Sequence, residues 1–151
     1  MRQRVVWPAL VACALLVAGC AAMHPRTERS AKRLDCDGGK ECAVAVDVAC
    51  VHFYGCELSV DYDVVVVDNE RGKNTEIVWR LGGEAGARFA SNGIVLDDPE
   101  FECRARGERE FACTDRHADF GVFKYRVNVT VRESVFGPRG VPSLDPWVVN
   151  R

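Results

Sequence analysis

Hydrophobic and polar residues alternate along several stretches of the chain, which is the pattern of β-strands with one buried face. The alternation is present from Ala43 to Cys50, from Cys56 to Val66 and from Thr75 to Leu81. It is clearest from Phe123 to Arg132, where apolar residues at odd positions alternate with polar or charged residues at even positions. We therefore expect each stretch to be a strand with one face toward a core and one toward solvent.

Turn-forming residues separate these stretches, and no segment has a sustained helical period. The expected turns lie at 68–74, 82–86, 91–93 and 106–109. The stretch from Arg88 to Leu96 is less regular, and Trp147 to Val149 is expected to be a short edge strand. Short strands with turns at this spacing predict an all-β fold, an antiparallel β-sandwich, with a small antiparallel β-barrel as the alternative.

The start of the chain has the layout of a bacterial export signal. Met1–Arg4 is positively charged, and Val5–Ala18 is apolar and broken only by Pro8. This run is too short to cross a bilayer as a helix, which takes about 20 apolar residues. The sequence therefore predicts a cleaved leader, and any attachment to a membrane must come from another source.

The motif Val17-Ala18-Gly19-Cys20 resembles the lipobox of bacterial lipoproteins. The resemblance implies that the Cys20 thiol carries a diacylglyceryl group, that cleavage leaves Cys20 at the mature N-terminus, and that the acyl chains hold the protein on a membrane. Ala21 is not the aspartate of an inner-membrane retention signal, so the resemblance implies an outer-membrane lipoprotein facing the periplasm. An ordinary secretory signal cleaved within 18–22 is the alternative.

Three segments follow from this interpretation: a signal peptide over 1–19, a lipidated N-terminus with a basic tether over 20–34, and one β-sandwich domain over 35–151. The tether lacks large apolar residues apart from Met23 and Leu34. Its basic side chains predict either a solvated spacer or a contact with anionic lipid headgroups, and we favour the spacer. The remaining chain is long enough to bury a hydrophobic core.

The predicted domain contains an even number of cysteines, which indicates disulfides in an exported chain. They are Cys36, Cys42, Cys50, Cys56, Cys103 and Cys113. The alternation places Cys50 and Cys56 on the inward faces of two successive strands, where they oppose each other across a hairpin. By the same geometry Cys103 opposes Cys113 across the hairpin with its tip at 106–109.

The two remaining cysteines, Cys36 and Cys42, would close a small loop. A nested arrangement, in which Cys36 bonds to Cys56 and Cys42 bonds to Cys50, stays open as an alternative. Zinc bound by Cys50, His52 and Cys56 is a further alternative, because thiolates and imidazole are its usual ligands. We favour disulfides, because an oxidising compartment converts paired thiols to disulfides.

The run Asp119-Phe120-Gly121-Val122-Phe123-Lys124-Tyr125 resembles the Asp-x-Gly-x-Tyr-x-Cys approach to the sixth strand of immunoglobulin domains. The resemblance implies an immunoglobulin-like sandwich. Phe123 stands where the tyrosine would be, and Tyr125 stands where the cysteine would be. The resemblance therefore concerns structure alone. A wider pattern of spaced residues from Trp79 to Val129 resembles small uncharacterised bacterial envelope proteins. This second resemblance implies no activity.

The net charge and the types of reactive residue reduce the number of function classes that we expect. The chain has 20 basic and 22 acidic residues and a net charge of −2, so no strong field is directed at nucleic acid. His117 lies near Asp115 and Asp119 in the sequence, but three common residue types do not by themselves indicate a catalytic triad. Asp35 and Asp37 lack the spaced carboxylates of a calcium loop. We expect no enzymatic activity, no cofactor and no metal ion.

Two classes of function remain. The first is a membrane-anchored interaction or structural module that binds another envelope protein through exposed basic residues. The candidate residues are Arg104, Arg106, Arg109, Lys124, Arg126 and Arg132. The second is a lipoprotein that binds a small ligand or inhibits an enzyme. The run from Gly86 to Ala90 resembles part of the inhibitory loop of anchored lysozyme inhibitors, although their Ser-Gly-Ser-Gly and Trp-x-Lys-Gly elements are absent.

Overall fold

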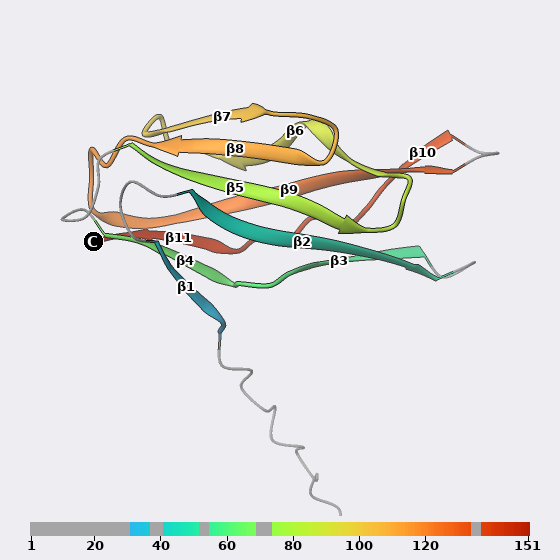
Figure 1. Cartoon of the computed structure of the whole chain (residues 1–151), viewed down its shortest axis with the longest axis horizontal. Helices are drawn as coiled ribbons and strands as arrows, with labels where there is room; N and C mark the ends of the chain where they lie inside the picture. The colour runs from blue at the N-terminus through green and yellow to red at the C-terminus, as the bar shows by residue number, and fades with distance from the viewer. Residues whose placement is uncertain (1–30, 37–40, 52–54, 69–73, 134–136) are drawn as a thin grey trace, which may run out of the picture.

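The chain folds into two β-sheets, in a computed structural model that describes residues 31–36, 41–51, 55–68, 74–133 and 137–151. Figure 1 shows that the strands of both sheets run roughly along the long axis of the molecule. The strands in these ranges are β1 (Arg33–Cys36), β2 (Cys42–Val51), β3 (Gly55–Val60), β4 (Val64–Val67), β5 (Thr75–Gly83), β6 (Ala87–Leu96), β7 (Phe101–Ala105), β8 (Glu110–Asp115), β9 (Gly121–Glu133), β10 (Gly137–Gly140) and β11 (Trp147–Asn150).

Both sheets contain parallel as well as antiparallel neighbours. The five-stranded sheet has the order β3-β2-β5-β8-β7, and the six-stranded sheet has the order β1-β4-β11-β9-β10, with β6 also paired to β9. Strand β2 is parallel to β5, and β4 is parallel to both β1 and β11. The predicted all-β sandwich is confirmed and the sheets do not close into a barrel, but these parallel pairings depart from the purely antiparallel sheets that we expected.

The hydrophobic core lies between the sheets, on the faces that the alternation predicted. Even-numbered residues of β2 from Cys42 to Val48 and odd-numbered residues of β9 from Tyr125 to Val131 are buried. Aromatic pairs, each worth about 0.5–1.5 kcal/mol beyond its burial, connect one sheet to the other. They are Trp79–Tyr125, with ring centroids 5.2 Å apart, Phe89–Phe111 at 5.8 Å and Phe101–Phe123 at 5.0 Å.

The expectation of one strand from Cys56 to Val66 is wrong, because β3 and β4 lie in different sheets. The Asp61 carboxylate accepts a backbone amide of β2 at 2.9 Å, and the Asp63 carboxylate accepts the amide of the residue before β1 at 3.0 Å. Such side-chain acceptors compete with the strand ladder and allow the chain to leave one sheet for the other. The inward residues change as a result, since Val65 and Val67 belong to the core.

Two further expectations about individual segments are corrected. Strand β11 is not an edge strand, because it lies between β4 and β9. The turn expected at 91–93 is part of β6, whose register against β9 shifts between Phe89 and Ile94. A shift of this kind is a bulge, in which extra residues fit into a strand without ending it.

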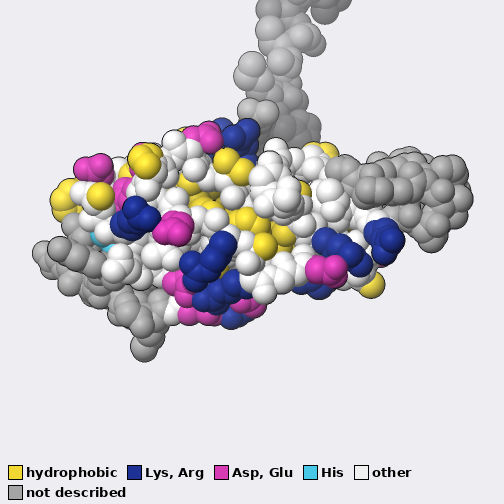
Figure 2. Space-filling model, turned by 90° about the horizontal axis from the view of Figure 1, so that it is seen from above, with side chains coloured by type: hydrophobic (Ala, Val, Ile, Leu, Met, Phe, Trp, Pro, Cys, Tyr) yellow, Lys and Arg dark blue, Asp and Glu magenta, His cyan; other side chains and the backbone are white. Residues whose placement is uncertain are grey.

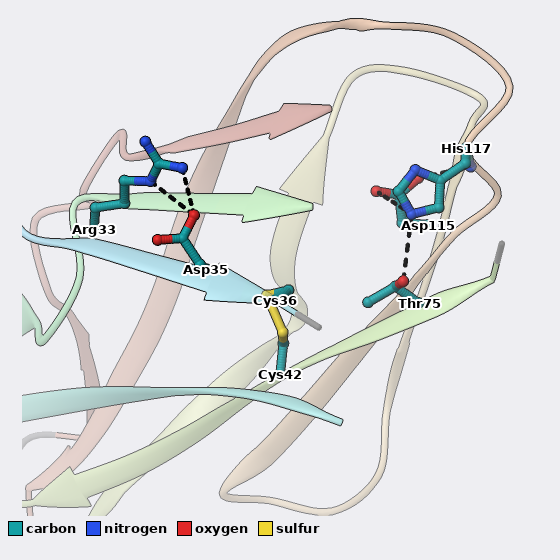
Figure 3. Close-up of a disulfide and its surroundings, with 7 residues drawn as sticks. All are labelled: Arg33, Asp35, Cys36, Cys42, Thr75, Asp115 and His117. Carbon is teal, nitrogen blue, oxygen red and sulfur yellow. Dashed lines mark hydrogen bonds and ion pairs between the residues drawn. A yellow bond between two sulfur atoms is a disulfide. The ribbon is translucent and has the colours of Figure 1, made fainter. Parts of the chain in front are cut away.

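The predicted disulfide pairing is confirmed, and the nested alternative is wrong. Cys50–Cys56 joins β2 to β3 and Cys103–Cys113 joins β7 to β8, each within the five-stranded sheet. The third bond, Cys36–Cys42, joins β1 of one sheet to β2 of the other (Figure 3). Strand β1 begins at Arg33, two residues before the start that we expected for the domain.

Candidate interaction surface

The six basic residues predicted to form an interaction face lie on more than one surface. Arg104 and Arg106 belong to the β7–β8 hairpin of the five-stranded sheet. Lys124, Arg126 and Arg132 are exposed on β9, in the six-stranded sheet. The structure therefore does not bring these residues together into one basic patch.

Both hairpin arginines are held by carboxylates. Arg106 pairs with Glu41 at 3.2 Å, with Glu110 at 3.3 Å and also with Glu76, and Arg104 pairs with Glu76 at 3.2 Å. Figure 2 shows Lys and Arg side chains next to Asp and Glu side chains on one face of the molecule. Because opposite charges alternate within this network, it presents little net positive charge to a partner.

Arg109 has a structural role. Its guanidinium donates to the backbone oxygens of Leu81 at 3.1 Å, Glu84 at 3.0 Å and Ala87 at 3.2 Å. These contacts attach the hairpin to the connection between β5 and β6. Hydrogen bonds from a charged donor are stronger than neutral ones, so Arg109 fixes this connection.

The basic residues near the middle of β9 are partnered but remain close to apolar surface. Lys124 Nζ lies 2.9 Å from an Asp145 oxygen and 5.7 Å from the centre of the Trp147 ring. Arg126 lies 3.3 Å from Asp97. The exposed ring of Trp147 beside Lys124 gives this part of the sheet an apolar surface as well as a charged one.

Apolar side chains gather on the outer face of the six-stranded sheet, next to Lys124. We name five residues the outer strip: Val64, Phe120, Val122, Trp147 and Val149. The register places Val64 beside Trp147 and Val149 beside Val122, while Phe120 directly precedes β9. The exposed fraction is 71% for Phe120, 62% for Val122 and 41% for Trp147. Large apolar side chains that are exposed side by side mark a contact surface.

Charged pairs border the outer strip on two sides. On β1, Arg33 Nε donates to Asp35 at 2.9 Å (Figure 3), and Arg151 lies 3.6 Å from the same carboxylate. On β9, the pair of Lys124 and Asp145 occupies the opposite border. An apolar centre with a polar rim is the usual composition of a protein–protein interface.

Sequence reasoning missed the outer strip, although one signal for it is present. Val122 has the same strand parity as Lys124 and Arg126, so it is an apolar residue on the polar face of β9. Trp147 and Val149 of the strip come beside Val122 only through the pairing of β9 with β11. That pairing connects segments more than 20 residues apart in the sequence.

A groove of about 350 Å³ lies beside Trp147, between β3 and the segment before β11. Its lining residues are Leu58, Ser59, Val60, Asp63, Leu144, Asp145, Pro146 and Trp147. The groove is open to solvent along one side.

Beneath one end of the outer strip, five buried side chains form what we call the buried polar cluster: Thr75, Glu100, Asp115, His117 and Asn150. Figure 3 shows His117 against Asp115 and Thr75. The His117 amide donates to Asp115 Oδ1 at 2.9 Å, and its ring Nε2 lies 3.3 Å from Thr75 Oγ1.

Asn150 connects the two carboxyl groups of the cluster. Its Nδ2 donates to Glu100 Oε1 at 3.0 Å and to Asp115 Oδ1 at 3.2 Å, which links β11 of one sheet to β8 of the other and to the residue before β7. Burial, together with the charge of Asp115, raises the pKa of Glu100. The side chains of His117 and Asp115 are fully buried, and the cluster connects the sheets.

The residues considered for metal binding are otherwise engaged or lie outside the described part. Cys50 and Cys56 are bonded to each other, which removes both thiolates. Asp35 pairs with Arg33, while Asp37 and His52 lie outside the described residues. In the ranges that the structure describes, no three His, Cys, Asp or Glu side chains are grouped to hold a metal ion.

No protein-family model matches this sequence, and no curated protein matches it. The predicted leader, the lipobox with Cys20 and most of the tether lie outside the described residues. In the described ranges, the chain has no helix of the length and hydrophobicity needed to span a membrane.

Proposed function

We propose that this chain is a lipid-anchored module of the bacterial cell envelope that binds another envelope protein. In this proposal, acyl chains on Cys20 hold it at the outer membrane, facing the periplasm, and the outer strip is the contact surface. The observation that carries the proposal is the exposure of Val122 and Trp147 on one face of the six-stranded sheet, with exposed Phe120 directly before β9.

The residue types of the outer strip support a protein partner. Aromatic residues are enriched among the residues that contribute most to protein–protein affinity, because they bury a large area at a small cost in side-chain entropy. Trp147 and Phe120 would be the anchors of the interface. Lys124, over the ring of Trp147, would contribute to its polar rim.

The disulfides support the export that the leader predicts. All six cysteines in the described ranges are paired, as expected in an oxidising compartment such as the periplasm. The lipobox resemblance then accounts for membrane attachment, because two or more acyl chains hold a protein on a bilayer more firmly than one.

A small-ligand or inhibitor lipoprotein is the second candidate, and the groove beside Trp147 favours it. Its volume of about 350 Å³ lies at the low end of the range of about 300 to 1,000 Å³ for ligand sites. The run from Gly86 to Ala90 gives less support, because all of it after Gly86 lies within β6 and Arg88 pairs with Glu108 at 2.8 Å. An inhibitory loop would instead extend from the surface.

A photo-crosslinking residue at Val122 tests the proposal in intact cells that produce the full chain. The matched control carries the same crosslinker at Glu102, an exposed position in the other sheet. We expect a specific crosslinked protein from position 122 that is absent from position 102. Equal crosslinking from both positions, or none from either, would overturn the assignment of the outer strip as the contact surface.

A further inference from the structure

The buried polar cluster is connected directly to the outer strip. Glu100 Oε1 accepts the amide of Asp119 at 3.3 Å, and Asp119 precedes Phe120 of the strip. Asn150 of the cluster follows Val149 of the strip in β11. The cluster therefore holds the backbone at two neighbouring points at one end of the strip, because Asn150 pairs with Gly121.

Two carboxyl groups lie close together in this buried site. Glu100 and Asp115 both accept hydrogen bonds from the same nitrogen, Asn150 Nδ2. Two ionised carboxylates in one buried site repel each other, so the ionised form of Glu100 is disfavoured beside Asp115. Burial and the charge of Asp115 raise the pKa of Glu100 above its ordinary value of 4.5, and they outweigh the amide of Asp119, which favours the ionised form.

The other titratable and charged groups near Glu100 make contacts of their own. His117 Nε2 lies 3.9 Å from the second Asp115 oxygen, and Asp98 accepts the Glu100 amide at 2.9 Å. The guanidinium of Arg116 pairs instead with the exposed carboxylate of Glu102 at 2.8 Å.

The segment between the cluster and the strip is held in an unfavourable backbone conformation. His117 has a φ of 49°, in the left-handed region that non-glycine residues rarely adopt. The bonds of His117 to Asp115 and Thr75 keep it there. Strained residues persist only while the surrounding contacts hold them, so this segment is poised to relax when the contacts weaken.

We propose that the buried polar cluster is a pH-sensitive latch for the outer strip. With Glu100 protonated, the cluster holds the segment 116–120 and the end of β11 in the arrangement described above. When Glu100 ionises, repulsion from Asp115 loosens this segment and changes the presentation of Phe120 and Val122. The role of the strip rests on the proposed function, whereas the latch itself does not.

The raised pKa of Glu100 determines how the stability of the latch changes with pH. A carboxyl group with a raised pKa in the folded protein stabilises the fold at low pH, and this contribution is lost as the pH rises through the folded value. The latch is therefore closed in acid and loosens as the pH rises through the raised pKa of Glu100.

Thermal unfolding of the mature chain, made soluble by Cys20→Ser, tests the latch between pH 4.5 and pH 8. In this background we compare the parent, Glu100→Gln, which stays neutral at every pH, and the matched control Glu102→Gln, which removes an exposed carboxylate. We expect Glu100→Gln to unfold about 4 °C or more above the parent at pH 8 and at the same temperature at pH 4.5. Glu102→Gln should follow the parent. The same gap at both pH values, or no gap, would overturn the proposal.

A second measurement separates a latch from a purely structural cluster, and its main readout uses the parent chain. The Glu100 carboxyl carbon and the amides of Phe120 and Val122 are followed by NMR across the same pH range. We expect all three to titrate together, with a midpoint above 4.5, and His117→Gln to leave that midpoint in place. A Glu100 midpoint at or below 4.5, strip amides that do not follow it, or loss of the transition in His117→Gln would overturn the latch.

Crosslinking from Val122 at pH 5.5 and pH 7.5 distinguishes failure of the latch from failure of the proposed function. A crosslinking yield that changes between the two pH values supports both the latch and the proposed contact surface. A strong yield that is independent of pH overturns regulation of the strip. An absent yield together with an intact Glu100 titration overturns the proposed contact surface and supports the latch alone.

Discussion

Gly93 shows how tightly the core is filled at a single position. A Cβ atom at this residue would lie 2.8 Å from Phe89 Cβ and 2.9 Å from Phe111 Cδ2, closer than such atoms approach in folded proteins. Phe89 and Phe111 form one of the aromatic pairs that connect the sheets. A glycine is therefore required here for space, because any side chain would push these rings apart.

Gly93→Ala is expected to lower the free energy of unfolding by about 1–3 kcal/mol, the usual cost of forcing an extra group into a packed core. Urea denaturation of the purified domain measures the change. Gly107→Ala is the matched control, because a Cβ on Gly107, at the tip of the β7–β8 hairpin, meets open space. Its effect should stay within about 0.5 kcal/mol, and equal losses at the two glycines would contradict the packing described here.

The need for glycine at position 93 could not be predicted from the neighbouring sequence. Ser91-Asn92-Gly93 has the composition of a turn, and a local pattern favours that interpretation. The actual reason is contact with Phe111, a residue of another strand that packs across the core. Contacts of this kind come from tertiary structure and leave no local signal.

At the scale of strands, inward and outward faces were predictable while strand direction was not. Alternation fixes which residues face each other across a hairpin, and it identified Cys50 with Cys56 and Cys103 with Cys113. The same alternation is compatible with parallel or antiparallel neighbours, so the parallel pairing of β2 with β5 could not be seen. The change of sheet between β3 and β4 depends on hydrogen bonds of Asp61 and Asp63, whose residue type alone indicated an exposed face.

The strands depend more on core packing than on a hairpin disulfide. Trp79 is fully buried in β5, and Trp79→Ala is expected to cost about 3–5 kcal/mol through lost burial and the remaining cavity. Replacing both Cys103 and Cys113 with alanine opens a loop of sequence separation 10 and should cost less, below about 3 kcal/mol. Thermal unfolding midpoints of the two variants make the comparison.

Arg126→Ala is the control for that comparison. The side chain of Arg126 is exposed on the outer face of β9 and pairs with Asp97, so its removal should barely change the midpoint. A larger effect from Arg126→Ala than from Trp79→Ala would contradict the assignment of inward and outward faces in β9.

At the scale of the whole molecule, the proposed contact surface and the start of β1, to which the predicted tether leads, belong to the same sheet. The tether leads into β1, at the edge of the six-stranded sheet that carries the outer strip. The segment from Cys20 to Lys32 spans at most about 45 Å when fully extended. If Cys20 is the anchor, a partner bound to the outer strip lies near the membrane surface.

Metabolic labelling with palmitate, followed by cell fractionation, tests most directly whether Cys20 anchors this domain in the envelope. The full chain should be labelled and should fractionate with membranes. Cys13→Ser, which alters a leader cysteine outside the lipobox, should behave in the same way. Cys20→Ser should be unlabelled and should appear in the soluble periplasmic fraction, because the acyl chains that hold the protein on the membrane would be missing. A Cys20→Ser protein that is still labelled and still membrane-bound would contradict the account.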